Sequence, residues 1–482
     1  MNAVKLSGLQ PAAVFGYFEK ICSIPHGSGN TKKLSDYLMD FAQKRGLEAY
    51  QDQLNDVIII KEATAGYEEA EPVIIQGHMD MVCEKTPDCP KDMAAEGLDL
   101  VVEGDVIYAK DTTLGGDDGI AVAIALALLD AEDLPHPRLE VLLTVDEETG
   151  MDGAMGIDVS KVRGRRMLNL DSEEEGVFTV SCAGGNRTTC VLPIRREACP
   201  WEGVAVTVGG LAGGHSGAEI HRGLGNACTL LGRVLAAMRT GAELRLVSVT
   251  GGLKDNAIPR TATALITAVD AREAMAVAAK LDTILKEEYR AADGGVFVSA
   301  APAGVDTLPM DADSTARVVN FLSCAPNGVQ VMSADIPGLV QTSLNLGILT
   351  TEEESVTAAF CVRSSVESQK EMMVQRLKCL AALCGGTASV WGDYPGWAYR
   401  PDSPLRELLT EVYCEQYGTE PRVEAIHAGL ECGLFAGKLP GLDCVSLGPD
   451  LKEIHTTREK MHIASVQRLW AMVTETLRRM KP

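Results

Sequence analysis

The chain has 482 residues, which at about 150 residues per domain predicts roughly two to four structural units. Apolar residues make up 46% and charged residues 23%, as in ordinary globular proteins, so a fibrous, collagen-like or intrinsically disordered chain is excluded. Acidic residues outnumber basic ones by 67 to 44, a formal charge of −23. We therefore expect neither nucleic acid nor anionic lipid as a partner, because the chain lacks the positive field that attracts phosphate.

The sequence also indicates a cellular compartment. No apolar run reaches the roughly 18–20 residues that a membrane-spanning helix needs, so no membrane segment is expected. The N-terminal stretch 1–18 has no charged segment before a long apolar core, so no signal peptide is expected either. The 14 cysteines include no C-x-x-C pair. This usage predicts reduced, mostly buried thiols in a cytoplasmic protein, without a cysteine zinc site.

Strand-like and helical patterns alternate over the first part of the chain. Apolar residues at helical spacing predict a helix over 31–47, and the segment 118–129 is apolar all round, as expected of a buried helix. Buried strands are predicted from short apolar runs at 57–60, 73–75, 139–145 and 167–170. This alternation predicts an α/β fold, with a mixed, mostly parallel sheet and helices on both faces.

The pattern changes near residue 187. From there to about residue 300 the predicted order is βαββαβ, and a weaker version of a similar order continues to residue 391. We interpret residues 187–399 as an inserted α+β lid domain of two βαββαβ-like sandwiches. After residue 400 the alternation of strand and helix seen in the first part returns, so we predict that 1–186 and 400–482 are the two parts of one main domain.

Acidic and imidazole side chains follow the predicted strands of the main domain. They are His78 and Asp80, Glu147 and Glu148, Asp171, and, beyond a strand at 445–448, His455. A glycine-rich turn over 115–119 carries Asp117 just before the buried helix. Ligands of open α/β sheets bind at the carboxyl ends of the strands, so we expect these side chains to meet there.

If they meet, five carboxylates crowd one site. Two like charges about 4 Å apart repel by about 4 kcal/mol at an effective dielectric constant near 20. Several such pairs would exceed the stability of an ordinary domain, about 5–15 kcal/mol. The carboxylates must be protonated, be spread apart, or be neutralised by cations, and two divalent cations would balance them. Imidazole and carboxylate donors without thiolate suit Zn²⁺ and also Mn²⁺ or Co²⁺.

Adjacent Glu147 and Glu148 point to hydrolysis. Neighbours in an extended segment face opposite ways, so one can bind metal while the other stays free. Paired divalent ions lower the pKa of a bound water and polarise a carbonyl group. The free glutamate can then act as general base and later as acid to the leaving amine.

Several motifs occur in the order found in one enzyme superfamily. They are GHMD at 77–80, GDDG at 116–119, DEETG at 146–150, NLD at 169–171 and GHSG at 214–217, followed by His455. This series resembles the co-catalytic zinc metallopeptidases that include peptidase T, peptidase V, carnosinase and carboxypeptidase G. The length, DSEE at 171–174, HAGLECG at 427–433 and the run 447–455 resemble most the aminoacyl-histidine dipeptidases of the cytosolic peptidase D type.

The resemblance implies a set of metal ligands. His78, Asp117 and Asp171 would hold one ion, and Asp117, Glu148 and His455 would hold the other, with Asp117 bridging the two. His462 competes with His455 for the last position, and we favour His455 because it follows the strand directly. The Asp117–Asp118 peptide would be cis.

The resemblance also implies catalytic and substrate-binding roles. Glu147 would be the general base, Asp80 the partner of His78, and His215, in the lid, the residue that supports the carbonyl oxygen in the transition state. Three more residues are expected at the substrate: Asn256 and Arg363 at its terminal carboxylate, and Gly429 through its backbone.

The implied function is two-metal hydrolysis of dipeptides, of the Xaa-His kind such as β-alanyl-histidine, by a metal-bridged hydroxide. The expected partner is a small peptide substrate, and a homodimer is left open. Two alternatives remain: a deacylase of N-acyl amino acids, which the same metal site could serve, and a catalytically silent metal-binding scaffold. An intact Glu147 speaks against the scaffold, because a structural metal site needs no free base.

Overall fold

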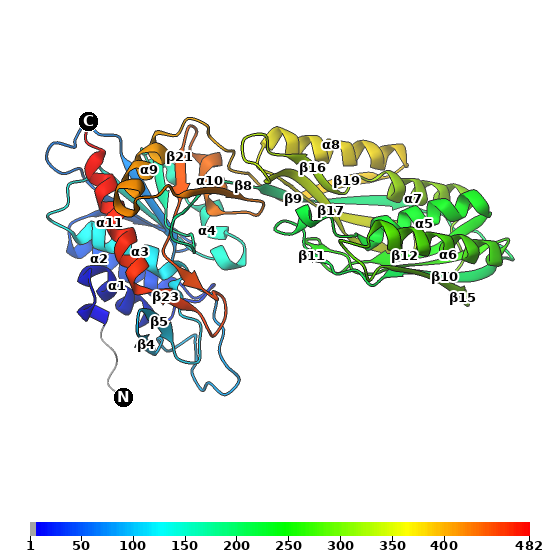
Figure 1. Cartoon of the computed structure of the whole chain (residues 1–482), viewed down its shortest axis with the longest axis horizontal. Coiled ribbons are helices and arrows are strands. Elements are labelled where there is room, and N and C mark those ends of the chain that lie inside the picture. The colour runs from blue at the N-terminus through cyan, green and yellow to red at the C-terminus, as the bar shows by residue number, and fades with distance from the viewer. Residues whose placement is uncertain (1–5) are drawn as a thin grey trace. The chain divides into compact units, whose positions relative to one another are not determined.

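The structure is a computed structural model that describes residues 6–482. Residues 1–5 of the stretch considered for a signal peptide lie outside the described part. The described chain divides into two compact units (Figure 1). The first comprises 6–181, Tyr399–Ala425 and Leu430–Pro482, and the second comprises Cys182–Ala398 and Ile426–Gly429. The domain limits expected from the sequence stay predictions, because compactness alone does not show which segments fold as one domain.

The first unit is built on an eight-stranded sheet of order β1-β2-β6-β3-β7-β21-β8-β20. Its strands are β1 (Glu48–Gln51), β2 (Val57–Lys61), β3 (Val73–His78), β6 (Leu139–Thr144), β7 (Arg166–Asn169), β8 (Val177–Cys182), β20 (Arg422–Ile426) and β21 (Asp443–Ser446). The neighbours β6, β3, β7 and β21 run parallel, β2 is antiparallel to both β1 and β6, and β8 is antiparallel to β21. The carboxyl ends of four central strands therefore share one edge.

Helices cover this sheet. They are α1 (Ala12–Cys22), α2 (Lys32–Lys44), α3 (Gly116–Asp130), α4 (Asp152–Gly156), α9 (Pro404–Tyr417), α10 (Glu431–Lys438) and α11 (Ile463–Arg479). Helix α3 lies against β3 and β6 and is itself covered by α1, which explains why it is apolar all round. A small second sheet is formed by β4 (Leu100–Glu103), β5 (Val106–Ala109), β22 (Leu451–Lys452) and β23 (Lys460–His462). The predicted α/β class is confirmed.

The second unit carries a nine-stranded antiparallel sheet of order β15-β10-β14-β12-β17-β18-β9-β19, with β16 beside β17. Its strands are β9 (Gly184–Pro193), β10 (Glu202–Gly209), β12 (Leu244–Gly251), β14 (Ala262–Ala268), β15 (Phe297–Pro302), β16 (Gly328–Met332), β17 (Val340–Thr351), β18 (Ser355–Ser364) and β19 (Thr387–Tyr394). A two-stranded ribbon pairs β11 (Gly214–His215) with β13 (Ala257–Ile258). The strands of both halves of the predicted insertion lie in one sheet, joined where β12 pairs with β17.

The helices of the second unit are α5 (Ala227–Gly241), α6 (Ala271–Glu288), α7 (Ala312–Cys324) and α8 (Glu367–Leu383). Its first half follows the order β10, α5, β12, β14, α6, β15. A continuous apolar core joins α5 to strand residues such as Ile266 and Leu346. Within residues 6–482 the 14 cysteines form no disulfide bond. Among residues 6–482, every helix is too short or too polar to cross a bilayer.

Candidate active site

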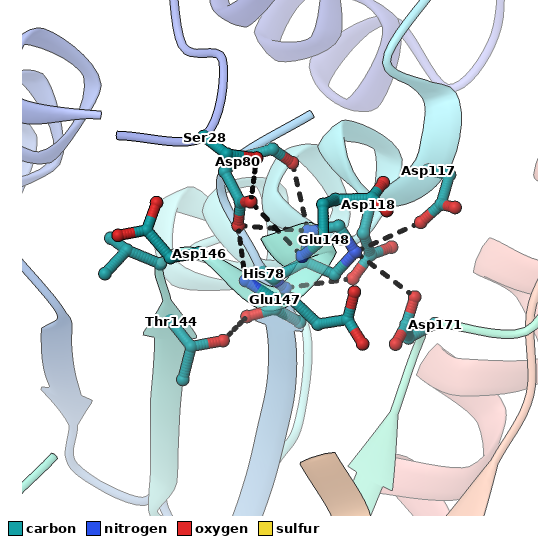
Figure 2. A network of polar contacts seen from close by, with 12 residues as sticks. Ser28, His78, Asp80, Asp117, Asp118, Thr144, Asp146, Glu147, Glu148 and Asp171 are labelled. Carbon is teal, nitrogen blue, oxygen red and sulfur yellow. Dashed lines mark hydrogen bonds and ion pairs between the residues drawn. The ribbon is translucent and has the colours of Figure 1, made fainter. Parts of the chain in front are cut away.

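The shared edge of the parallel strands delivers the acidic and imidazole side chains to one place (Figure 2). Strand β3 ends at His78, and Asp80 follows two residues later. Glu147 and Glu148 lie in a short 3-10 turn just after β6. Asp171 follows β7, Asp117 lies at the start of α3, and His455 lies in the turn between β22 and β23. The side chains come from five separate places in the chain, so only the folded chain assembles the cluster.

Asp117 joins the two imidazoles. Its Oδ1 lies 3.1 Å from Nε2 of His78, and its Oδ2 lies 3.1 Å from Nε2 of His455. On the far side, Nε2 of His455 lies 2.9 Å from Oε1 of Glu148, and Nε2 of His78 lies 3.5 Å from Oδ1 of Asp171. One carboxylate therefore faces two separate His–carboxylate pairs, an arrangement that suits a ligand shared by two ions.

The ring of His78 has a defined tautomer. Its Nδ1 lies 3.0 Å from the Asp80 carbonyl oxygen and 3.5 Å from Oδ1 of Asp80, both acceptors, so Nδ1 carries a proton. In the neutral ring, Nε2 then offers a lone pair to the carboxylates of Asp117 and Asp171, which would repel it. A cation between these atoms, or a second proton on the ring, removes this repulsion. A carboxylate behind the imidazole is also the usual support for a metal-binding histidine.

The donor set fits divalent cations. Two groups of ligand atoms, each within 4.8 Å of one another, are His78 with Asp117 and Glu148, and His78 with Asp118 and Asp171. Nitrogen and oxygen donors without sulfur suit Zn²⁺, Mn²⁺ or Co²⁺. The Asp117–Asp118 peptide is cis, as the resemblance implied.

Asp80 also fixes the turn that carries the two glutamates. Its Oδ1 accepts a hydrogen bond from the backbone N–H of Glu147 at 3.1 Å, and its Oδ2 is 3.4 Å from the backbone nitrogen of Glu148. The Ser28 hydroxyl donates to the same Oδ2 at 2.7 Å (Figure 2). Asp80 is 1% exposed, so these contacts are shielded from water. The end of β3 and the glutamate turn are therefore held by one carboxylate.

Burial and neighbouring charges shift the proton affinities of the cluster. Burial raises the pKa of Glu147 to about 9 and that of Asp171 to about 6 in the metal-free chain. Burial also opposes ionisation of Asp117, but hydrogen bonds from His455 and His78 outweigh it and hold the pKa of Asp117 below its usual range. A bound cation would oppose the upward shifts by favouring the ionised carboxylates. Only the ionised form of Glu147 can accept a proton from water, so a role as base belongs to the chain with its cations bound.

The remaining predicted residues lie in the second unit. His215 ends β11, and its Nδ1 accepts hydrogen bonds from the backbone N–H groups of Gly217 (3.3 Å) and Ala218 (3.0 Å), so its proton is on Nε2. Asn256 lies on the opposing segment, where its carbonyl accepts from the Ser216 N–H at 2.9 Å. The structure therefore places His215 and Asn256 on adjoining segments and leaves the His215 Nε2–H available as a donor.

Arg363, on β18, lies close to His215. A Cβ atom added at Gly217 would lie 3.0 Å from Cε1 of His215, 3.3 Å from Nε of Arg363 and 2.4 Å from the carbonyl oxygen of His427, so this approach requires glycine. Arg363 is 7% exposed, and its Nε has no hydrogen-bond partner among the described residues. A buried guanidinium with an unused N–H is suited to an anionic group. Gly429 belongs to the same short segment as His427.

The structure also brings in residues that the sequence analysis did not single out. The Asp118 carboxylate accepts from the His78 N–H at 3.1 Å and is fully buried, but nothing in the GDDG motif tells which aspartate faces which way. Ser28 gave no signal, because serine is ordinary in a loop. His427 binds Ser343 Oγ through Nε2 at 2.7 Å, and burial, with Arg363 nearby, lowers its pKa to about 3.

Glu431 was also missed. It is wholly buried, its Oε2 accepts from Gln76 at 2.5 Å and from Thr144 at 2.7 Å, and burial raises its pKa to about 7. The HAGLECG motif marks this residue in the sequence, but its place beneath the ends of β3 and β6 is visible only in the fold. His462, the competitor of His455, ends β23 with its Nδ1 3.9 Å from Asp105. Both histidines lie outside the two groups of candidate ligands, but the ring of His455 contacts Asp117 and Glu148, which belong to one of them.

Comparison with known proteins decides the family. The family described as Peptidase family M20/M25/M40 matches residues 74–479. The chain belongs to this family. The resemblance predicted from the motifs is thereby confirmed.

Two relatives cover this M20/M25/M40 peptidase from end to end. The Cytosol non-specific dipeptidase of Escherichia coli is 40% identical over 98% of this chain and 99% of its own. The crystal structure of aminoacylhistidine dipeptidase from Vibrio alginolyticus superposes with a TM-score of 0.94 at 37% identity, over 99% of this chain and 98% of the other. Aminopeptidase PepT from Bacillus cereus, at a TM-score of 0.57 and 16% identity over 98% and 100% of the two chains, shares the fold.

Proposed function

We propose that this protein is a metallo-dipeptidase that hydrolyses the peptide bond of dipeptides, including Xaa-His substrates such as β-alanyl-histidine. The placement of Asp117 between His78 and His455, 3.1 Å from each ring, is the observation that carries the proposal. Family membership and the two dipeptidase relatives support it. The relatives are named for different substrate ranges, so the breadth of dipeptide preference is part of what must be measured.

In this proposal His78, Asp117 and Asp171 hold one ion, and Asp117, Glu148 and His455 hold the other. Zn²⁺ is the expected metal, with Mn²⁺ or Co²⁺ as alternatives that the same donors accept. When bound, two such ions lower the pKa of water and polarise the scissile carbonyl.

The protein's own groups then move the protons. Glu147, adjacent to a ligand but not itself one in this assignment, takes a proton from the attacking water and delivers it to the leaving amine. Asp80 keeps the His78 proton on Nδ1 and holds the turn that carries Glu147. Glu147 accepts this proton only in its ionised form, which bound cations would favour against the neutral form that burial favours.

Residues of the second unit are proposed to act on the substrate. His215 donates from Nε2 to the carbonyl oxygen as negative charge develops there. Arg363 and Asn256 bind the terminal carboxylate, and Gly429 offers a backbone group. The unused Nε–H of buried Arg363 supports this assignment, because an anion would satisfy it. The protein is proposed to be cytoplasmic, in keeping with the relative named a cytosol enzyme, and a homodimer stays a prediction.

One set of assays tests the function. Protein reconstituted with Zn²⁺ or Mn²⁺ is incubated with β-alanyl-histidine, Gly-His, Ala-Ala and N-acetyl amino acids, and amine release is followed. We expect turnover of dipeptides and little of the acetylated compounds. Turnover of the acetylated set alone would favour a deacylase, and no turnover by protein shown to hold its metal would leave the scaffold.

A further inference from the structure

Helix α3 begins without a capping residue of its own. Gly115, at its N-cap, has a left-handed backbone (φ 66°) and no side chain, so it cannot bind the free N–H groups of the first turn. These N–H groups lie just before Asp117, at the buried end of the helix. Buried N–H groups without acceptors would be costly, so another part of the chain must supply the acceptor.

Glu459 supplies it. Its Oε2 accepts from the N–H groups of Leu114 at 2.8 Å and Gly115 at 3.1 Å, and its Oε1 accepts from Gly116 at 2.8 Å. The side chain is 3% exposed. A Cβ at Gly116 would lie 3.2 Å from Oε1, so glycine keeps this approach open. The Glu459 carboxylate therefore caps the helix from a position 343 residues beyond Gly116 in the sequence. Its negative charge also suits the positive N-terminal end of the helix.

The same glutamate belongs to the His455 turn. Strands β22 and β23 pair Lys452 with Lys460, and residues 453–459 form the turn between them. Within the turn the Glu459 N–H donates to the Thr456 carbonyl at 3.2 Å, and His455 itself has a left-handed backbone (φ 59°). His455 is half exposed, and within residues 6–482 only Asp117 and Glu148 lie within hydrogen-bond distance of its ring, so little else holds the ring in place.

We propose that Glu459 is a positioning residue that locks the Asp117 turn to the His455 turn and so sets the affinity of the cation shared by Asp117, Glu148 and His455. This inference rests on the proposed metal site. Asp117 also contacts His78, and Glu459 does not touch His78. The cation held by His78, Asp117 and Asp171 should therefore depend less on Glu459. Residues behind metal ligands typically contribute 10–100-fold to metal affinity.

The test is a cation titration of the chelator-treated protein, followed by Co²⁺ absorbance and by competition of Zn²⁺ with a chromogenic chelator. Glu459→Gln keeps the size of the side chain but loses its charge and puts an amide among three N–H donors. Glu453→Gln is the matched control, since Glu453 lies on the same turn with an exposed side chain that pairs with Arg458. All measurements are made at a temperature where circular dichroism shows each apoprotein folded.

We expect one binding step of Glu459→Gln to weaken by about 10–100-fold and the other by less than about threefold, with Glu453→Gln unchanged. Equal weakening of both steps, or no weakening, would overturn the proposal. Glu459→Asp is measured in parallel in case the glutamine variant does not fold. Its carboxylate is drawn back by one methylene, so this variant must also weaken one binding step. Cation binding by Glu459→Asp as tight as that of the wild type would equally overturn the proposal. Fewer than two cations bound by the wild-type chain would instead contradict the proposed function.

Discussion

Asp117 and Glu147 show how identical chemical groups acquire different tasks from their surroundings. Both carboxylates are largely buried, but Asp117 has an imidazole against each oxygen and stays ionised. Among the described residues, no imidazole lies within hydrogen-bond distance of the Glu147 carboxyl, and burial raises its pKa. The proposed division into ligand and base therefore follows from local contacts rather than from residue type.

Replacing Glu147 with glutamine tests that division. The amide cannot accept a proton from water, so we expect kcat for dipeptide hydrolysis to fall by about 10²–10⁴-fold. Two cations should still bind, because Glu147 is not among the proposed ligands. Metal content by atomic emission and steady-state kinetics check both expectations, with Glu69→Gln, at an exposed loop, as control. Loss of a cation together with activity would make Glu147 a ligand.

The buried carboxyl of Asp56, which is not one of the proposed metal ligands, should make the stability of the fold depend on pH. Burial, reinforced by the nearby Asp52 carboxylate, raises its pKa from 3.8 to about 8, while its Oδ1 accepts from the Val145 N–H at 2.9 Å. The folded chain thus binds this proton more tightly than the unfolded chain does. The stabilisation that protonated Asp56 gives the fold is complete below pH 3.8 and is lost as the pH rises to about 8.

Asp56→Asn should remove this slope. Urea unfolding at pH 5, 6, 7 and 8 is expected to show wild type losing up to about 1.4 kcal/mol per pH unit relative to the variant, whose amide can still accept from Val145. Parallel stability curves for the two proteins would show that Asp56 is ionised in the fold.

At the scale of elements, the approach of α3 to β3 decides where the site forms. A Cβ at Gly77 would lie 2.4 Å from Oδ2 of Asp118 and 2.7 Å from Cβ of Ala121, so the strand and helix touch through glycine and alanine. The same Asp118 oxygen accepts from the His78 N–H. The closeness of the two elements therefore sets the height of His78 above the sheet edge.

Gly77→Ala should disturb both packing and metal binding. Overpacking of a tight interior typically costs about 1–3 kcal/mol, measurable as a lower urea midpoint, and the displaced Asp118 should also weaken cation binding. Gly16→Ala, in the middle of α1 with open space around the added methyl, is expected to be neutral or more stable by up to about 1 kcal/mol. Equal effects of the two substitutions would argue against a close contact at Gly77.

Elements were predictable from sequence where burial leaves a pattern. The apolar runs at 57–60 and 73–75 fall within β2 and β3, and the segment 118–129 falls within α3, because buried elements must be apolar. The edge strand β1 and the short ribbon β11–β13 were not predicted, since half-exposed or two-residue strands leave no period to detect. The meeting of strand ends could be predicted from the parallel order alone. The contact of Glu459 with the α3 turn could not, because it depends on the path of the chain over hundreds of residues.

At the scale of the whole molecule, two compact units each contain a buried core, and every candidate metal ligand belongs to the first. The sequence motifs name the predicted ligands one by one along the chain. Nothing in them shows that His215 and Arg363 meet against Gly217, because that contact depends on the register of an antiparallel sheet. The net charge of −23 adds to the cost of leaving the acidic cluster without cations.

Removing the metal should therefore destabilise the two units unequally. Ligand binding stabilises the folded form by about 2.7 kcal/mol at one hundred times Kd, and the proposed cations bind only the first unit. Three tryptophans, Trp201, Trp391 and Trp397, lie in the second unit and Trp470 lies in the first. In a Trp470→Phe variant, tryptophan fluorescence thus reports the second unit alone. We expect chelation to abolish hydrolysis. It should also lower the Tm of the first unit, followed by circular dichroism, since 1 kcal/mol moves the Tm of a 150–250-residue unit by about 2–4 °C. The Tm that fluorescence gives for the second unit of the variant should change by no more than about 1–2 °C. A fluorescence transition that follows the metal as strongly as circular dichroism does would show that the two units unfold as one.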